Sequence, residues 1–382
     1  MTQTQRDERE IHRFEFRGKT PEYFKIWLVN VLLSIITLGL YSPWATVRTR
    51  RYFYGTTVLG GANFEYHADP RSILVARLVL VALIVGGSFI AGEDAVRSAV
   101  HSSLLFLLLP WAMVRGFAFN ARNSSYRGIR FGFVRRYLRL YLIFLPATAL
   151  IIAFNYYIAA LLLTPENELA SVYPLVVAPV LAALAGVWVS APFTSRAYHR
   201  FKAEHHRLGR TELGFRPARR RGYLCALWLL PLAAAAVAAG IGWIFLSTGW
   251  LQAMLGWYDA IAAYILLLVL ALVTAWLLLT SMLFKLYWAG VTAQRGRILC
   301  DISVWRFALH IRLVNLLAAL LTLGLAIPWT RIRRAAYLAA HFAVETEPQA
   351  MQFLLADTAR AGSAFGDEFA AGQGFDFDVG LI

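Results

Sequence analysis

Residues 30–44 read NVLLSIITLGLYSPW, and residues 315–329 read NLLAALLTLGLAIPW. Aligning 23–52 with 308–337 gives 13 identical residues in 30 positions. Matches between leucines mean little in apolar segments, whereas matches at Asn, Thr, Gly, Pro, Trp and Arg mean more. We interpret the two stretches as copies of an internal repeat, a feature that must be settled before the elements are assigned.

Each copy carries an Asn, a Pro, a Trp and an Arg at the same spacing. An Asn inside an apolar helix must be paired, a Pro bends or ends a helix, and a Trp suits the membrane interface. A nearby Arg either anchors the helix end or binds an anionic headgroup. The candidate lipid or solute contacts are therefore Asn30, Pro43, Trp44, Arg48, Asn315, Pro328, Trp329 and Arg333. Inter-helix hydrogen bonding and helix anchoring are the structural alternatives.

The composition is that of a membrane protein. Of 382 residues, 59% are hydrophobic, and the mean hydropathy is +0.56, whereas a soluble domain is about half apolar. The net charge is +15, but the basic residues lie in loops beside apolar runs. The charge rule for cytoplasmic loops explains them, so nucleic-acid binding is not expected.

The apolar runs predict an all-α polytopic membrane protein with six to eight transmembrane helices, because a lone segment in lipid must satisfy its own backbone. The loops between the runs alternate between basic and acidic, which places the basic ones in the cytoplasm. The six middle runs then form three hairpins. The eight apolar segments are 22–41, 73–91, 99–114, 137–163, 172–191, 223–246, 260–284 and 304–327.

Short alternating stretches in the basic loops predict cytoplasmic β-strands. The clearest are 14–18, 61–66 and 128–133, and weaker ones are 211–215 and 296–300. We expect at least two of the first three to pair in a small cap. The chain then divides into a cytoplasmic N-terminal segment (1–21), a membrane domain (22–344) and a flexible acidic tail (345–382).

The two copies are short for a membrane span. Residues 26–40 and 313–327 are free of charge, and 15 helical residues extend about 22 Å, less than the hydrocarbon core of about 30 Å. The sequence Thr-Leu-Gly-Leu offers a place for the chain to turn. We predict that both copies are re-entrant or interfacial and that both termini are cytoplasmic; the alternative is eight full spans.

Several motifs resemble the YjgN family of bacterial inner-membrane proteins, a domain of unknown function. They are Phe14-Glu15-Phe16-Arg17-Gly18, the run from Thr37 to Ala45, Arg51-Tyr52 and Gly61-x-x-Phe64-x-Tyr66. The resemblance implies a polytopic protein of the bacterial inner membrane, and it implies no reaction.

Motifs of soluble enzymes are missing from the sequence: there is no G-x-S-x-G, H-E-x-x-H, G-x-x-x-x-G-K-[ST] or C-x-x-C. Cys225 and Cys300 give no metal spacing. His199 and His206 share a helix face and could hold a metal with Glu204, but a basic interfacial helix is the simpler interpretation. No metal or cofactor is expected, and the missing motifs disfavour an enzyme that acts on lipid.

Two functional hypotheses follow. The first is binding or transport of a small solute or lipid by the helix bundle, since repeats with broken helices are common in transporters. The alternative is a membrane scaffold whose cytoplasmic strands and basic helices recruit a partner. Anionic lipid headgroups are the expected partners, and a protein partner or a homo-oligomer remains open.

Overall fold

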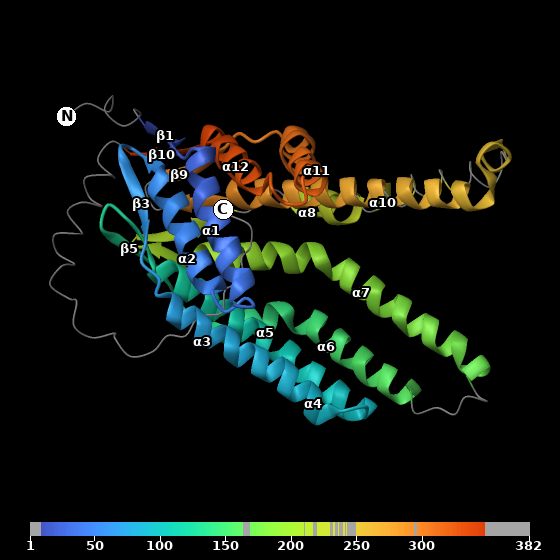
Figure 1. Cartoon of the computed structure of the whole chain (residues 1–382). Coiled ribbons are helices and arrows are strands. Elements are labelled where there is room, and N and C mark those ends of the chain that lie inside the picture. The colour runs from blue at the N-terminus through green and yellow to red at the C-terminus, as the bar shows by residue number, and fades with distance from the viewer. Residues whose placement is uncertain are drawn as a thin grey trace.

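The computed structural model describes residues 9–162, 169–209, 211–216, 220–229, 250–293 and 296–347, with single positions between 232 and 242. Ten antiparallel strands close into a barrel in the order β1-β10-β9-β8-β7-β6-β5-β4-β3-β2. The barrel lies at one end of the molecule, and the helices extend away from it in one general direction (Figure 1). A closed barrel leaves no unpaired strand edge.

Eight of the strands form four hairpins, and the first and last strands of the chain complete the ring. β1 pairs with β10 from Glu10 opposite Thr346 to Arg13 opposite Ala343. The strands are β1 (Glu10–Phe16), β2 (Thr57–Leu59), β3 (Ala62–Tyr66), β4 (Ser124–Tyr126), β5 (Ile129–Phe133), β6 (His206–Leu208), β7 (Thr211–Phe215), β8 (Val291–Ala293), β9 (Gly296–Cys300) and β10 (Phe342–Thr346).

Helical segments connect one part of the barrel to the next. The first connection consists of α1 (Thr20–Ile36) and α2 (Ser42–Thr56). The last consists of η5 (Arg306–Leu313), α11 (Val314–Leu321) and α12 (Ile327–His341). The other helices are α3 (Pro70–Val81), η2 (Ala82–Gly86), α4 (Gly87–Ala91), α5 (Ala95–Arg122), α6 (Tyr137–Leu162), α7 (Leu169–Glu204), α8 (Arg220–Leu224), η4 (Cys225–Leu229) and α10 (Trp250–Trp288). The segments η2, η4 and η5 are π-helical.

Aromatic side chains fill the inside of the barrel near β1. The Phe14 ring lies 6.1 Å from Phe64 on β3, although β2 separates the two strands. Such a contact requires both rings to point inward. Phe14 also meets Phe342 at 6.5 Å, and Phe64 meets Tyr126 at 4.8 Å. Since neighbouring residues in a strand point to opposite faces, the exposed Arg13 and Glu15 lie on the outer surface.

Ion pairs join the last strand to its neighbours. The Glu345 carboxylate of β10 accepts hydrogen bonds from Arg297 Nε at 2.6 Å and from Arg9 NH1 at 3.1 Å. These guanidinium groups lower the pKa of the Glu345 carboxyl group. Glu345 and Thr346, which the sequence assigned to the acidic tail, therefore belong to the barrel; the rest of that tail, from residue 348, lies outside the described residues.

The predicted all-α fold is wrong, because the ten-stranded barrel is a major part of the architecture. By length and composition, four helices of the described chain could cross a membrane, not six to eight: Pro70–Ala91, Ala95–Arg122, Tyr137–Ala160 and Ile265–Trp288. The predicted segments 22–41 and 304–327 are not among them. Segment 172–191 lies in α7, and most of segment 223–246 falls outside the described residues.

The predicted pairing of the cap strands is also wrong in its detail. The stretches 14–18, 61–66 and 128–133 overlap β1, β3 and β5, which belong to one barrel, but β2 and β4 lie between them. These two strands have three residues each. Three positions show too little alternation to be recognised in a sequence, so the intervening strands were missed.

Candidate functional site

The repeated Thr-Leu-Gly-Leu sequence forms the same tight turn in both places. Leu38 and Gly39 have φ values of 50° and 89°, and Leu323 and Gly324 have values of 49° and 92°. Glycine adopts this region without steric cost, whereas leucine does not. The Thr37 hydroxyl stabilises the first turn: it donates to the Leu33 carbonyl at 2.7 Å and accepts from the Tyr41 N–H at 3.0 Å.

The second turn repeats these bonds. Thr322 Oγ1 donates to the Ala318 carbonyl at 2.7 Å and accepts from the Ala326 N–H at 2.9 Å. We call α1 with α2, and η5–α11 with α12, the two short hairpins. Their tips are apolar, with Leu38 94% exposed and Leu323 95% exposed.

The two candidate prolines begin helices rather than bend them. Pro43 lies in the first turn of α2 and Pro328 in the first turn of α12. At this position the missing N–H of proline leaves no intrahelical bond unmade. Both rings are buried, so they contribute to packing.

The two candidate asparagines hold the arms of each hairpin together. Asn30 Nδ2 donates to the Ala45 carbonyl at 3.4 Å, and Asn315 Nδ2 donates to the Thr330 carbonyl at 3.0 Å. Each bond lies within one short hairpin and none joins Asn30 to Asn315. The inter-helix interpretation of these residues is therefore supported, while the idea of a bond between the copies is not.

The remaining candidates differ between the hairpins. Arg333 places its guanidinium 5.0 Å from the centre of the Trp329 ring and donates to Asn315 Oδ1 at 3.4 Å. Trp44 instead stacks on Tyr41, with ring centres 6.1 Å apart, and Arg48 is exposed.

The two short hairpins lie side by side. Arg331 of α12 donates to the Tyr23 hydroxyl of α1 at 2.8 Å. Tyr23, Phe53 and Ile332 form a buried cluster between them. The eight candidate residues thus occupy two adjacent hairpins, but none of them lines either of the two cavities described next.

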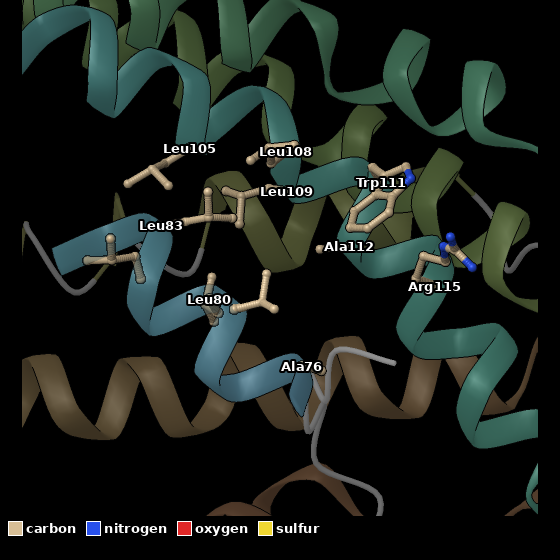
Figure 2. Close-up of a pocket in the computed structure, with 11 residues that line it drawn as sticks. Ala76, Leu80, Leu83, Leu105, Leu108, Leu109, Trp111, Ala112 and Arg115 are labelled. Carbon is tan, nitrogen blue, oxygen red and sulfur yellow. The ribbon is translucent and has the colours of Figure 1, made fainter. Parts of the chain in front are cut away.

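An apolar groove of about 310 Å³ lies between α3–η2 and α5. Its walls are Ala76, Val79, Leu80, Leu83, Ile84, Leu105, Leu108, Leu109, Trp111, Ala112 and Arg115. Trp111 and Arg115 lie at one end, and Leu83 and Leu105 lie towards the other (Figure 2). Arg115 is the single charged residue in this lining.

Arg115 has little to neutralise it. Its guanidinium lies 5.2 Å from the centre of the Trp111 ring, and its Nε is buried with no hydrogen-bond partner among the described residues. A buried N–H group without a partner is costly. The guanidinium group carries a positive charge at this end of the groove and could donate hydrogen bonds to an anionic oxygen.

A π-helical turn shapes the far part of the groove. The ring Nε2 of His101, on α5, lies 3.0 Å from the Leu83 carbonyl oxygen of η2. This approach depends on Gly87, where an added Cβ would lie 2.1 Å from His101 Nε2. The contact joins η2 to α5 at the far end of the groove.

A second cleft, of about 960 Å³, lies where α10, η5 and the end of α12 meet the barrel. Its charged residues are Lys285, Asp301 and Arg306, and His341 also lines it. Because these charges have both signs, the cleft favours no single class of ligand.

The histidines near the end of α7 are engaged in packing. His199 Nδ1 lies 2.9 Å from the Tyr223 hydroxyl, and His206 Nδ1 lies 2.5 Å from the Lys202 carbonyl. Burial lowers the pKa of His206 to about 4. In the described residues there is no group of three or more potential metal ligands.

Arg115 directly follows the predicted apolar segment 99–114, and the sequence around it contains a motif that could have identified it. Residues 110–115 read PWAMVR, residues 43–48 read PWATVR and residues 328–333 read PWTRIR. In all three places the arginine precedes the next strand by nine residues, with those strands beginning at Thr57, Ser124 and Phe342. The groove arginine and two candidate arginines are thus equivalent in position along their helices.

The long apolar helices define the class of this protein, a membrane protein. A family model of bacterial proteins of unknown function, DUF898, matches residues 11–372, so the chain belongs to that family. The inner membrane protein YjgN of Salmonella typhimurium is 37% identical over 123 residues, which are 32% of this chain and 31% of that protein.

YjgN of Escherichia coli K12 is 30% identical over 190 residues, 49% of this chain and 47% of the relative. The chain thus spans less than half the length of the curated relatives it matches. These relatives confirm the resemblance to YjgN and a location in the bacterial inner membrane. No solved structure matches the chain.

Proposed function

We propose that this protein crosses the inner membrane several times and binds an anionic phospholipid in the groove between α3–η2 and α5. The observation that carries the proposal is an apolar groove that ends at Arg115, the single charged residue of its lining. Phospholipids combine an acyl chain with a phosphate, which are the two chemistries that such a site requires.

The dimensions agree with one lipid leaflet. Leu105 and Arg115 are ten residues apart on α5, which corresponds to about 15 Å along a helix. Half of a hydrocarbon core of about 30 Å is the same length. A phosphate at Arg115 would leave the acyl chain beside Leu108 and Leu105, pointing towards the bilayer centre.

The charge pattern supports a cytoplasmic barrel. The residues that link the strands to the helices include Arg17, Lys19, Arg135 and Arg136, and Arg71 lies in the first turn of α3. The far end of the α4–α5 hairpin instead carries Glu93, Asp94 and Arg97. Basic segments remain in the cytoplasm, so the groove faces the cytoplasmic leaflet. Arg48 and Arg333, at the same helical position as Arg115, are proposed as further headgroup contacts.

The geometry gives less support to the alternatives. Aromatic rings occupy the interior of the barrel near β1, which argues against passage of a solute along its axis. Recruitment of a partner by strand addition requires a free sheet edge, and the closed barrel leaves none. Lipid binding needs no rearrangement of either feature.

Native mass spectrometry of the purified protein with bound phosphatidylglycerol or cardiolipin tests the proposal. One basic contact with an anionic headgroup contributes about 1 kcal/mol, so we expect Arg115→Gln to lower occupancy about fivefold. Arg97→Gln, at the exposed far end of the same helix, is the control for charge and should match the wild type. Leu108→Trp should fill the groove and lower binding without a charge change.

Equal occupancy of anionic lipid in wild type and Arg115→Gln would reject this site. Equal losses in Arg115→Gln and Arg97→Gln would reject it as well, because they would indicate a general effect of net charge.

A further inference from the structure

The arginine of the Pro-Trp-x-x-x-Arg motif marks the same distance from the barrel on three helices. We call this distance the arginine level. Arg48, Arg115 and Arg333 each stand nine residues before a strand of the same barrel, so they lie at similar depths from it. In two of the three, the guanidinium covers the motif's own Trp ring, at 5.2 and 5.0 Å. Arginine and tryptophan together are typical of the membrane interface.

Helix α5 extends from the arginine level far enough to cross a full bilayer. From Arg115 to Ala95 at the start of α5 there are 20 residues, or about 30 Å, which equals the thickness of the hydrocarbon core. Between Arg97 and Arg115 the helix contains no Asp, Glu, Lys or Arg. Acidic residues Glu93 and Asp94 lie just beyond its far end.

The short hairpins extend only half as far from the same level. From Arg48 to Ser42, where α2 begins, and from Arg333 to Ile327, where α12 begins, there are six residues, or about 9 Å of helix. A turn of five residues then completes each hairpin. At the tips the chain reverses, as the positive φ values of Leu38, Gly39, Leu323 and Gly324 require, and it returns to the barrel. Leu38, Leu40, Leu323 and Leu325 are exposed at the tips, which carry no charged residue.

We propose that the two short hairpins insert into the barrel-side leaflet only and end near the bilayer centre, where acyl chains cover their tips. Because the hairpins lie side by side through Tyr23 and Arg331, they form one continuous sector of half depth. The opposite leaflet passes over this sector, whereas α3–η2–α4 and α5 cross both leaflets. The occupant of the exposed apolar surface is thus the lipid of the barrel-side leaflet, and both ends of the described chain lie on the barrel side.

Cysteine labelling of the full-length protein in cells tests this topology, in a background where Cys225 and Cys300 are replaced by Ala. Leu38→Cys and Leu323→Cys report on the tips, and Ile36→Cys, 75% exposed, serves if a tip variant is poorly produced. Glu93→Cys, at the end of the spanning hairpin, is the matched control. An impermeant maleimide is applied to spheroplasts and to inside-out vesicles.

We expect Glu93→Cys to react from the periplasmic side and the tip cysteines to react from neither side until detergent is added. A permeant fluorophore on the tip cysteines should be quenched most by lipids with a nitroxide deep in the acyl chain. Reaction of the tips with the impermeant reagent from the periplasm would overturn the proposal in favour of full spans. Reaction from the cytoplasmic side would overturn it in favour of hairpins lying in water.

Discussion

The same Pro-Trp-x-x-x-Arg motif lies at the start of a helix in α2 and α12 but inside a helix in α5. Pro43 and Pro328 lie in the first turns of helices of 15 residues. Pro110 lies within the 28-residue α5, which continues for 15 residues on its N-terminal side. Proline therefore does not decide where these helices begin, since α5 contains Pro110 in its interior.

The residues before the proline account for the difference. Thr-Leu-Gly-Leu precedes Pro43 and Pro328 by two residues, whereas residues 104–109 before Pro110 read LLFLLL. Glycine supplies a residue with positive φ that a helix cannot contain, and the threonine hydroxyl completes the turn. An uninterrupted run of leucines and phenylalanine continues as a helix. A change of a few residues thus separates a short hairpin from a long one.

The largest expected effect concerns what holds the short hairpins in place. Phe53 is 1% exposed and packs against Tyr23, with ring centres 4.8 Å apart. We expect Phe53→Ala to lower the free energy of unfolding by about 3–5 kcal/mol, measured by chemical unfolding in detergent. Leu38→Ala, at the 94% exposed tip, should change it by less than about 0.5 kcal/mol. Similar losses in both variants would mean that the tip packs against protein.

A smaller effect is expected at the turn itself. Gly39 has a φ of 89° and no atom within 4 Å of an added Cβ, so only the backbone opposes a side chain there. We expect Gly39→Val to cost about 1–3 kcal/mol, seen as a lower melting temperature. Gly55→Ala is the control, because Gly55 lies in α2 without positive φ or a nearby atom. It should be neutral or stabilising by up to about 1 kcal/mol, and an equal cost in both variants would argue against the strained turn.

The smallest effect should appear in the hairpin that α3, η2 and α4 form with α5. Gly87→Ala would place a Cβ 2.1 Å from His101 Nε2, so the imidazole must leave the Leu83 carbonyl. The lost hydrogen bond costs about 1 kcal/mol, and the melting temperature should fall accordingly. Its neighbour Gly86 has open space at the Cβ position, so the melting temperature of the Gly86→Ala variant should not fall. If Gly86→Ala were as destabilising as Gly87→Ala, the cause would be the π-helical backbone rather than His101.

Local sequence signals were sufficient for some elements. The alternation of Phe14 and Phe16, Phe64 and Tyr66 on one face predicts β1 and β3 because strand residues point to alternate faces. Runs without charge predict the spanning helices, and the segments 73–91, 99–114, 137–163 and 260–284 overlap the four helices that could cross a membrane. The Thr-Leu-Gly-Leu sequence indicates a turn, and a turn is present in both places.

Other features depend on partners distant in the chain. β2 and β4 have three residues each and are stabilised by strands on both sides, so no local pattern reveals them. The closing pair joins β1 to β10, more than 300 residues apart. Arg115 directly follows the predicted apolar segment 99–114. Helix α5 extends through Arg122 and places Arg115 beside Ala76 and Leu80 of α3.

The sequence by itself determined which segments are apolar, where the aromatic strands lie and where the two short hairpins turn, because charge, periodicity and glycine act over a few residues. The tertiary structure alone decided that ten short strands close into a barrel and that an arginine ends an apolar groove. Both outcomes arise from contacts between distant segments: a three-residue strand is stable only when its neighbours complete its hydrogen bonds, and a groove exists only once two helices have packed.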